Sequence, residues 1–397
     1  MNCLFLGYVI DKEDCFKYKG PSVAGNKYQI GILDSLFSIP ESVVDVFTYF
    51  PIASYPHNKK ILIKKRKKKI NDKLDIHIIP FINIQYLKQI SIYLSMLFYG
   101  VLYLIKNQCD CIIYYNAFPP LSLVALLLGK IFKKKTICIV ADLPIHAYKY
   151  RGLKKLFNES RIVLTKRLIN NSDGLIVLNE NAAKEYAPEK PYIVIEGGVD
   201  LEEIKYIDRK IINSHHNDKI ILFYSGLLTE FNGIKILLEA FKLINNGLYE
   251  LHIYGNGELE QLVIKEAELC ENIKYHGYQK NNDILIAQRK SDILINPRPL
   301  KNGSEDVPTF PTKLLEYMCS GKPIITTPTA GVKSNIMDLF YISDDDSPIE
   351  IAKTIVNVSK INENERLDKA KYAKEFVENN FCWKSYNTKI DKFIKEI

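Results

Sequence analysis

Three charged side chains in the second half of the sequence have the types and spacing of a nucleotide-diphosphate site. Lys313 and Glu316 are three residues apart in a segment with helical periodicity, so they share one face of the expected helix. Arg298 follows a short apolar run. A guanidinium and an ammonium can neutralise a diphosphate, and a carboxylate can accept hydrogen bonds from the hydroxyls of a ribose. The alternative is a solvated helix on which Lys313 and Glu316 form a weak pair.

The segment around these residues has the order strand, loop, helix, strand. The apolar run 293–295 predicts a buried strand, and Pro311 suits the first turn of the helix that follows. Gly321 ends that helix, and 323–327 predicts the next strand. In a parallel α/β sheet, such a loop and helix start lie at the carboxyl edge, where ligands bind. Backbone N–H groups and the helix dipole favour an anion there.

The stretch 296–327 resembles the donor-site signature of the retaining GT-B glycosyltransferases of glycosyltransferase family 4. The shared core is Pro-Thr-Lys-x-x-Glu-Tyr-Met, followed by Gly-Lys-Pro-Ile. In that family the Lys contacts the donor phosphate and the Glu contacts the nucleotide ribose. The resemblance therefore implies these roles for Lys313 and Glu316.

One departure concerns the contacts to the donor sugar. The family usually has an earlier Glu eight residues before the second, and Pro308 stands at that place here. The contacts to the sugar would then come from elsewhere in the loop. Glu305 and Asp306 are the candidates.

A second departure concerns the donor diphosphate. The family pattern has an Arg just after the position of Gly226 and a Lys several residues on, where this chain has Leu227 and Asn232. Either Arg298 supplies the missing charge, or the chain binds its donor weakly or not at all. The second case makes a catalytically degenerate scaffolding subunit the alternative function. A nucleotide-sugar epimerase is a third reading, and the loop motifs fit it poorly.

Further donor contacts follow from the same resemblance. Gly255 and Gly257 come directly after an expected strand and match the family's G-x-G turn, which approaches phosphates or a base. The short strand 273–278 ends where the family places its backbone against the nucleobase. His276 and Tyr278 are therefore assigned to base contact.

The first half offers weaker candidates at the expected sheet edge. The loop 20–27, before an expected helix over 28–37, matches the family loop that contacts acceptor or donor phosphate. Gly25, Asn26 and Lys27 are its candidates for acceptor binding, and an ordinary turn between strand and helix is the alternative.

A second pair of candidates follows the expected strand 135–141. The family often has His-Asp-Leu at its end, close to the transferred sugar, and here Ala141 replaces the His. Asp142 remains, as a catalytic candidate that could orient an acceptor hydroxyl or balance positive charge. A helix cap is its alternative role, and His146 is a candidate for acceptor binding.

The 397 residues suffice for two α/β domains, and 47% hydrophobic and 25% charged residues are typical of a soluble protein. We expect an acceptor-binding domain over 1–200, a nucleotide-sugar-binding domain over 201–375, and a helix over 376–397 that returns to the first domain. Residues 201–218 are read as a linker. Eight cysteines without a C-x-x-C pair predict no disulfide framework or zinc site, which suits a reducing cytosol.

Residues 1–200 are basic, with 28 Lys and Arg against 17 Asp and Glu. The basic run 64–69 lacks interleaved aromatics, so an anionic membrane or a lipid diphosphate is expected there and not nucleic acid. The apolar run 90–105 predicts a buried core helix, since it is shorter than a membrane span. The alternative is an interfacial helix that acts with the basic segment 59–69 at a lipid surface.

The sequence thus predicts an α/β GT-B fold with two Rossmann-like domains facing across a cleft. The expected reaction is retaining, metal-independent transfer of a hexosyl group from a nucleotide-diphosphate sugar, with UDP as the expected nucleotide. The acceptor would be lipid-linked or a glycan, in the assembly of a bacterial surface polysaccharide such as a capsule. No cofactor is expected. Arg298 and Lys313 would neutralise the departing diphosphate. The expected location is cytoplasmic, with peripheral contact at the inner face of the plasma membrane.

Overall fold

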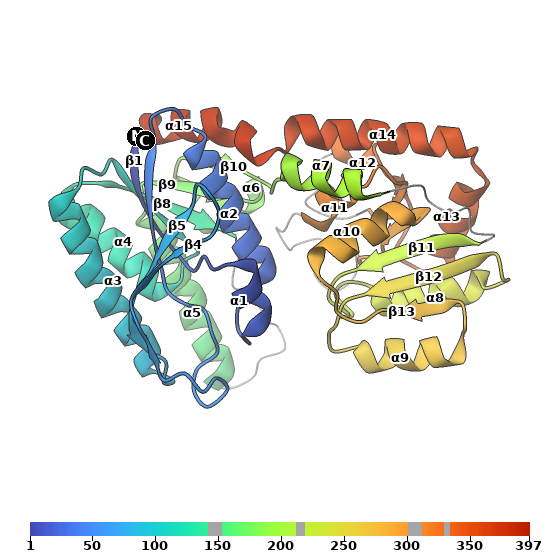
Figure 1. Ribbon diagram of the computed structural model, residues 1–397, viewed down its shortest axis with the longest axis horizontal. Helices are drawn as coiled ribbons and strands as arrows, with labels where there is room; N and C mark the ends of the chain where they lie inside the picture. Colours follow the sequence, from blue (N-terminus) through green and yellow to red (C-terminus); the bar gives the residue numbers. More distant parts are fainter. Residues whose placement is uncertain (142–152, 212–218, 301–311, 329–333) are drawn as a thin grey trace. The chain divides into compact units, whose positions relative to one another are not determined.

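The computed structural model divides the chain into two compact units, and each is described by itself (Figure 1). Unit 1 comprises residues 1–198 and 383–397, and unit 2 comprises residues 199–382. The structure describes residues 1–141, 153–211, 219–300, 312–328 and 334–397.

Unit 1 contains an eight-stranded sheet with the order β10-β9-β8-β7-β1-β2-β5-β4, parallel except where β4 pairs with β5. Two further strands, β3 and β6, form a small antiparallel sheet. The strands are β1 (Asn2–Gly7), β2 (Val43–Thr48), β3 (Leu62–Ile63), β4 (Arg66–Lys69), β5 (Asp75–Ile78), β6 (Phe81–Ile82), β7 (Cys111–Tyr115), β8 (Lys135–Val140), β9 (Gly174–Val177) and β10 (Tyr192–Val194). The central strands are buried along nearly their whole length, as a sheet covered on both faces requires.

The helices of unit 1 pack around this sheet. They are α1 (Lys12–Lys17), α2 (Val23–Phe37), α3 (Leu87–Lys106), α4 (Pro119–Phe132), α5 (Leu153–Asn170), α6 (Glu180–Tyr186), the 3-10 helix η1 (Trp383–Tyr386) and α15 (Asn387–Glu396).

Unit 2 contains a six-stranded, fully parallel sheet with the order β13-β12-β11-β14-β15-β16. This is the doubly wound order, whose topological switch point lies between β11 and β14. The strands are β11 (Ile220–Ser225), β12 (Tyr249–Tyr254), β13 (Ile273–Tyr275), β14 (Ile293–Asn296), β15 (Ile324–Thr326) and β16 (Tyr341–Ile342). The helices are α7 (Leu201–Lys210), α8 (Ile234–Ile244), α9 (Glu260–Leu269), α10 (Asn281–Lys290), α11 (Thr312–Met318), α12 (Ser334–Met337), α13 (Pro348–Lys360) and α14 (Glu363–Asn380).

The first long helix begins earlier than predicted. Helix α2 starts at Val23, because the Ser22 hydroxyl accepts a hydrogen bond of 3.1 Å from the N–H of Gly25 and caps the first turn. Residues 25–27 therefore lie in the helix and not in a loop before it. The expected loop is therefore wrong over residues 25–27, because Ser22, a preferred cap residue, starts the helix before Gly25.

The expected linker over 201–218 is also partly wrong. Residues 201–210 form α7, which Asp200 caps by accepting hydrogen bonds from the N–H groups of its first turn. Ile204 and Ile207 are buried on one face of this helix. Its charged residues lie elsewhere, and Asp208 pairs with Arg289 at 2.6 Å. Residues 212–218 of the expected linker, which include His215 and His216, lie outside the described residues.

The expected single helix over 376–397 is broken. Helix α14 ends at Asn380 in unit 2, and η1 and α15 belong to unit 1, where α15 packs on α2 and β10. Trp383 explains the break, because its indole is buried against Gly31 and Gly198 and stacks edge-on with Tyr28 at 5.4 Å. The chain therefore passes from one unit to the other between residues 198 and 199 and between residues 382 and 383. The predicted boundaries were 200/201 and 375/376.

This packing makes Gly31→Ala an informative substitution. A Cβ atom on Gly31 would overlap with the indole of Trp383, so we expect the free energy of unfolding to fall by about 2 kcal/mol, as for other overpacked cores. Chemical denaturation would measure it. The double variant Gly31→Ala/Trp383→Phe should lose less than the two single effects predict, since the smaller ring relieves the overlap. Full additivity would contradict this account.

The prediction that the run 90–105 forms a helix is confirmed, but its expected burial is wrong. Only 22% of the apolar window of α3 is buried. Ile92, Met96 and Leu104 pack into the core of unit 1, while the opposite face is exposed. Both faces of the helix are apolar in sequence, so periodicity could not distinguish the covered side. Among the described helices, α3 alone is long and apolar enough to cross a membrane by length and composition.

Candidate donor site

The candidate donor site lies at the switch point of the unit 2 sheet. The loop after β11 begins at Gly226, and the neighbouring strand β14 continues into Pro297 and Arg298. These two connections touch each other: a Cβ atom on Gly233, which has φ +76° at the start of α8, would overlap with the carbonyl of Pro297. Glycine is therefore required where the two backbones meet.

Lys313 presents a buried ammonium to this place. A Cβ atom on Gly226 would lie 3.1 Å from Lys313 Nζ, and this Nζ lies 4.4 Å from the centre of the Tyr224 ring. The Nζ atom is buried and has no hydrogen-bond partner among the described residues. Burial, and then the charge of Arg298, lower the pKa of Lys313 from 10.5 to about 7, although Glu316 acts in the opposite direction. An anion bound at this position would stabilise the charged ammonium and raise its pKa again.

Arg298 is the second cation of the site. Its side chain is buried, and its guanidinium carbon lies 4.4 Å from the centre of the Phe231 ring. Burial lowers its pKa. The Thr327 hydroxyl donates to the carbonyl of Arg298 and thereby joins the end of β14 to the end of β15. Because Arg298 acts on the pKa of Lys313, the two positive charges share one neighbourhood.

Glu316 is held in place by a residue that the sequence did not reveal. Gln288 Nε2 donates a hydrogen bond of 3.0 Å to Glu316 Oε1, and the Gln288 side chain is fully buried. This hydrogen bond fixes the position of Glu316 Oε1, while the buried Oε1 of Gln288 has no hydrogen-bond partner among the described residues. A polar residue in the middle of α10 gave no signal of this role.

The glycines of the β12 turn have close backbone neighbours. A Cβ atom on Gly255 would overlap with the carbonyl of Gly226, and one on Gly257 would lie 2.5 Å from the carbonyl of Leu228. Both glycines have positive φ. The Gly226 N–H also donates to the carbonyl of Tyr254 at 3.0 Å. These glycines thus pack the loops after β11 and β12 together.

His276 belongs to a chain of polar rings beside this turn. It stacks on Tyr254 with ring centres 4.3 Å apart, and its Nε2 lies 3.2 Å from His252 Nδ1. His252 in turn contacts Glu250 at 2.6 Å. Burial, and then His252, lower the pKa of His276, so its neutral ring is favoured. Alternation along β12 could have revealed the set, since residues 250, 252 and 254 share one face. Tyr278 is half exposed.

The second departure from the expected pattern, at Leu227 and Asn232, can be followed in the structure, whereas Pro308 lies outside the described residues. Leu227 is exposed, and Asn232 donates through Nδ2 to the Leu227 carbonyl at 3.2 Å and to Thr229 Oγ1 at 3.0 Å. Asn232 therefore closes the loop on itself, where the resemblance expected a cation.

The candidate residues of unit 1 lie near the switch point between β1 and β7. A Cβ atom on Gly25 would lie 2.6 Å from the Tyr8 hydroxyl and 3.2 Å from that of Tyr115. Asn26 uses its amide on the backbone of Ile10, with Oδ1 accepting at 3.0 Å and Nδ2 donating at 2.8 Å. Asn26 thus fixes the backbone of the segment after β1. Neither tyrosine was a candidate in the sequence analysis.

The remaining candidates are placed only in part. Lys27 is exposed on α2. Asp142, His146, Glu305 and Asp306 lie outside the described residues.

The segment before Asp142 is held by a residue that the sequence did not single out. The Asn116 side chain accepts a hydrogen bond of 2.9 Å from the N–H of Ala141. Asn116 has φ +58°, a conformation that asparagine tolerates better than most residues. It therefore links the loop after β7 to the end of β8.

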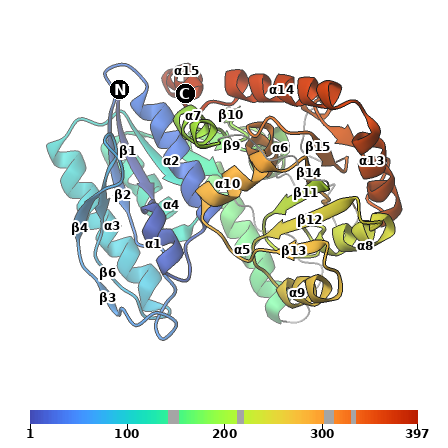
Figure 2. The same ribbon diagram turned by 45° about the vertical axis from the view of Figure 1, so that its right-hand side comes forward.

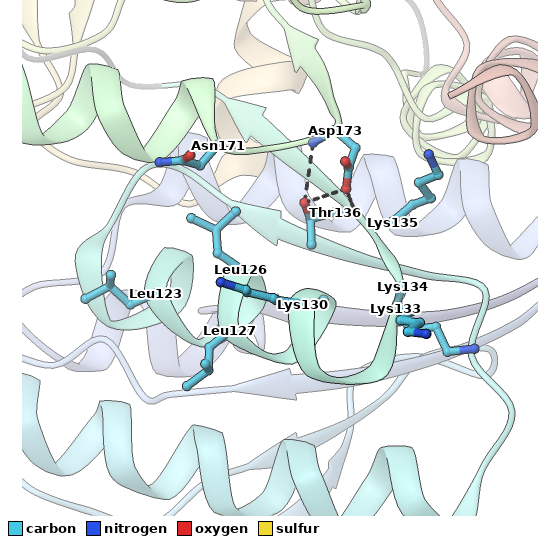
Figure 3. A pocket seen from close by; sticks show the side chains of 11 residues that line it. Leu123, Leu126, Leu127, Lys130, Lys133, Lys134, Lys135, Thr136, Asn171 and Asp173 are labelled. Atoms are coloured by element: carbon cyan, nitrogen blue, oxygen red, sulfur yellow. Dashed lines mark hydrogen bonds between the residues drawn. The ribbon is translucent and has the colours of Figure 1, made fainter.

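A hollow of about 620 Å³ lies at the opposite edge of the unit 1 sheet, where α4 ends and β8 begins (Figure 3). Lys130, Lys133 and Lys135 contribute to its lining, and Thr136 donates to Asp173 Oδ2 at 3.0 Å. Parallel α/β sheets bind ligands at the carboxyl ends of their strands. This hollow lies at the amino ends, apart from the unit 1 candidates.

Comparison with known proteins gives the class of the chain. The family model described as Glycosyl transferases group 1 matches residues 205–376. A similar sequence is the uncharacterized glycosyltransferase MJ1069 of Methanocaldococcus jannaschii, 27% identical over 305 residues, which are 71% of this chain and 74% of that protein.

Two solved structures are similar over the whole chain. Sucrose-phosphate synthase from Thermosynechococcus elongatus has a TM-score of 0.70 at 13% identity, covering 100% of this chain and 99% of that one. Anabaena HepE in complex with UDP-glucose has a TM-score of 0.64 at 14% identity, with 100% of both chains covered. The expected GT-B fold is confirmed, and the chain is a glycosyltransferase.

Proposed function

We propose that the protein transfers a hexosyl group, with retention of configuration, from a UDP-sugar to a lipid-linked or glycan acceptor. The process would be the assembly of a bacterial surface polysaccharide, and the location the cytoplasm, at the inner face of the plasma membrane. The observation that carries the donor assignment is the buried ammonium of Lys313, which has no described hydrogen-bond partner and lies beside Gly226 at the switch point.

The chemistry of the transfer needs positive charge at this place. When the bond between the anomeric carbon and the diphosphate oxygen breaks, negative charge grows on the departing diphosphate. Lys313 and Arg298 are desolvated cations that share one neighbourhood. Fixed charges in a site without water stabilise such a charge more strongly than solvent does. No metal ion or cofactor is needed in this proposal.

The choice of UDP has two supports. Anabaena HepE, which shares the fold, is described in complex with UDP-glucose. In this chain, Gln288 holds the carboxylate of Glu316, the candidate ribose contact, and His276, a candidate base contact, stacks on Tyr254. Asp142 is retained as the candidate that orients the acceptor, from the sequence pattern alone.

The donor assignment is tested by a thermal-shift screen with UDP-, GDP-, ADP-, CMP- and dTDP-sugars. We expect a UDP-sugar to raise the Tm by several degrees, because a ligand at 100 times its Kd stabilises a protein by about 2.7 kcal/mol. Other nucleotides should shift the Tm less. The absence of a shift with every conjugate would contradict the proposal.

A second candidate function is a GT-B subunit that scaffolds without catalysis. The replacement of two expected cations by Leu227 and Asn232 favours it. Mass spectrometry after incubation with the UDP-sugar and glycan or lipid-linked acceptors separates the two candidates. A glycosyltransferase releases UDP and yields an elongated acceptor, whereas a scaffold leaves both substrates unchanged.

A further inference from the structure

An exposed apolar stripe runs along α3. Ile90 and Leu94 are each 57% exposed, Phe98 is 59% exposed and Ile105 is 67% exposed. Their spacing of four, four and seven residues places them on one side of the helix. The opposite side is anchored in the core of unit 1 through Ile92 and Met96. The stripe is therefore a fixed feature of the folded unit.

The small sheet of β3 and β6 lies beside α3 (Figure 2). Leu62 and Ile82 are paired across the two strands, and both are exposed. The Ser91 hydroxyl accepts a hydrogen bond of 3.0 Å from the N–H of Ile82, which fixes β6 beside the first half of α3. Tyr86 and Leu87 are exposed at the start of the helix. Soluble proteins rarely expose a contiguous apolar surface of this kind without a partner.

A basic segment lies against the same helix. Within it, residues 66–69 form β4, which pairs antiparallel with β5, while β3 pairs with β6. Lys64 and Lys65 connect β3 to β4 and are exposed, and Lys65 Nζ lies 4.2 Å from the centre of the Tyr99 ring on α3. Lys67, by contrast, pairs with Asp75 at 2.8 Å. Lys65 thus lies against α3, and Lys64 is its exposed neighbour in the chain.

We propose that the exposed face of α3, the β3–β6 sheet and Lys64–Lys65 form a docking surface for an anionic lipid bilayer. Apolar side chains enter the boundary between headgroups and acyl chains, while nearby lysines attract anionic headgroups. This proposal extends the proposed function and rests on it for the lipid-linked acceptor. Docking would hold unit 1 at the bilayer, where such an acceptor lies.

The helix lies on the bilayer and does not cross it. By length and composition α3 could span a membrane, with 20 residues and a mean hydropathy of 1.4. Ile92, Met96 and Leu104, however, are part of the unit 1 core, and Gly100 packs closely on Leu128 of α4. Extraction of the helix would expose this core, whereas docking covers the exposed face and leaves the fold intact.

Co-sedimentation of the full chain with vesicles tests the surface. We expect binding to vesicles of phosphatidylcholine with phosphatidylglycerol, and binding at least tenfold weaker to phosphatidylcholine alone. Leu94→Gln/Phe98→Gln should weaken binding to the anionic vesicles about tenfold or more. Lys64→Gln/Lys65→Gln should weaken it about fivefold or more and reduce its dependence on salt. Both variants change exposed side chains, so the fold should be retained.

A matched control comes from unit 2. Leu243 on α8 and Leu269 on α9 are 60% and 73% exposed, and Leu243→Gln/Leu269→Gln should bind vesicles like the unchanged protein. The inference fails if the unchanged protein does not bind anionic vesicles, or if this control weakens binding as much as Leu94→Gln/Phe98→Gln. It also fails if light scattering shows a dimer that Leu94→Gln/Phe98→Gln dissociates, since a second copy would then cover the face.

The vesicle assay needs no sugar donor, so the two proposals can fail separately. An intact thermal shift with a UDP-sugar together with absent vesicle binding overturns the docking surface alone. Vesicle binding that depends on Leu94 and Phe98 supports the docking surface even where no nucleotide sugar shifts the Tm, a result that overturns only the proposed function.

Discussion

Lys313→Met is expected to lower the turnover of the UDP-sugar at least 100-fold while it stabilises the ligand-free protein. Loss of one group that stabilises growing negative charge typically costs 100- to 1,000-fold in turnover. Methionine retains an unbranched apolar stem over the Tyr224 ring, where Lys313 Nζ lies 4.4 Å from the ring centre. The substitution therefore removes the charge with little change in packing. Steady-state kinetics with saturating acceptor measures the loss.

The expected gain in stability follows from the pKa of Lys313. Burial and Arg298 lower it from 10.5 to about 7 in the folded chain, so between these pH values the unfolded chain binds more protons than the folded chain. The free energy of unfolding therefore rises with pH across this window. Below about pH 7 the full cost of the buried ammonium is present, of the order of a few kcal/mol. Lys313→Met removes this cost, less the attraction between the ammonium and the Tyr224 ring.

Thermal unfolding of both proteins across this pH range measures the effect. The advantage of the methionine variant should be largest near pH 6 and should shrink as the pH approaches 10. Lys313→Ala is a useful control, because it removes the charge and also leaves a cavity, so it should be less stable than Lys313→Met. An unchanged turnover, or a methionine variant less stable than the parent at pH 6, would refute the role given to Lys313.

Part of this site could be predicted from local sequence. Lys313 and Glu316 are neighbours on one short helix, so their spacing alone predicts that they share a face. Arg298 follows a buried strand, and the ends of adjacent parallel strands meet at one edge of the sheet. The structure brings these three residues close enough for Arg298 and Glu316 to act on the pKa of Lys313.

The missing parts depend on contacts between residues far apart in sequence. Gln288 orients Glu316 from another helix, and Asn116 holds the backbone at Ala141 from the preceding loop. No spacing rule connects such pairs. The prediction that α3 is buried was wrong for a related reason. Apolar residues indicate that a helix face avoids water, but they do not indicate what covers that face. The helix cap at Ser22, by contrast, could have been predicted from the sequence, because Ser is a preferred residue at the start of a helix.

Replacement of Arg298 is expected to change the pH dependence of donor binding as well as its strength. A diphosphate beside Lys313 raises the pKa of its ammonium, so binding takes up a proton when the solution is above the ligand-free value of about 7. Affinity for a UDP-sugar should therefore fall as the pH rises above 7, by up to about tenfold per pH unit. Arg298 lowers the pKa of Lys313, and Arg298→Gln should shift the start of this fall to higher pH while weakening binding about 10- to 100-fold.

Arg298→Lys separates the charge from the shape of the guanidinium. A lysine there keeps a positive neighbour for Lys313, so the fall in affinity should begin near the same pH as in the unchanged protein. It lacks the planar fork that binds two phosphate oxygens at once, so affinity should still drop at every pH. Isothermal titration calorimetry between about pH 6 and 8.5, in buffers of different ionisation enthalpy, measures both the affinity and the protons taken up. If Arg298 only supported the loop through Phe231, Arg298→Gln would weaken binding equally at all pH values, and proton uptake would not change. A shift in Arg298→Gln that is absent from Arg298→Lys would instead require two interacting cations at the diphosphate.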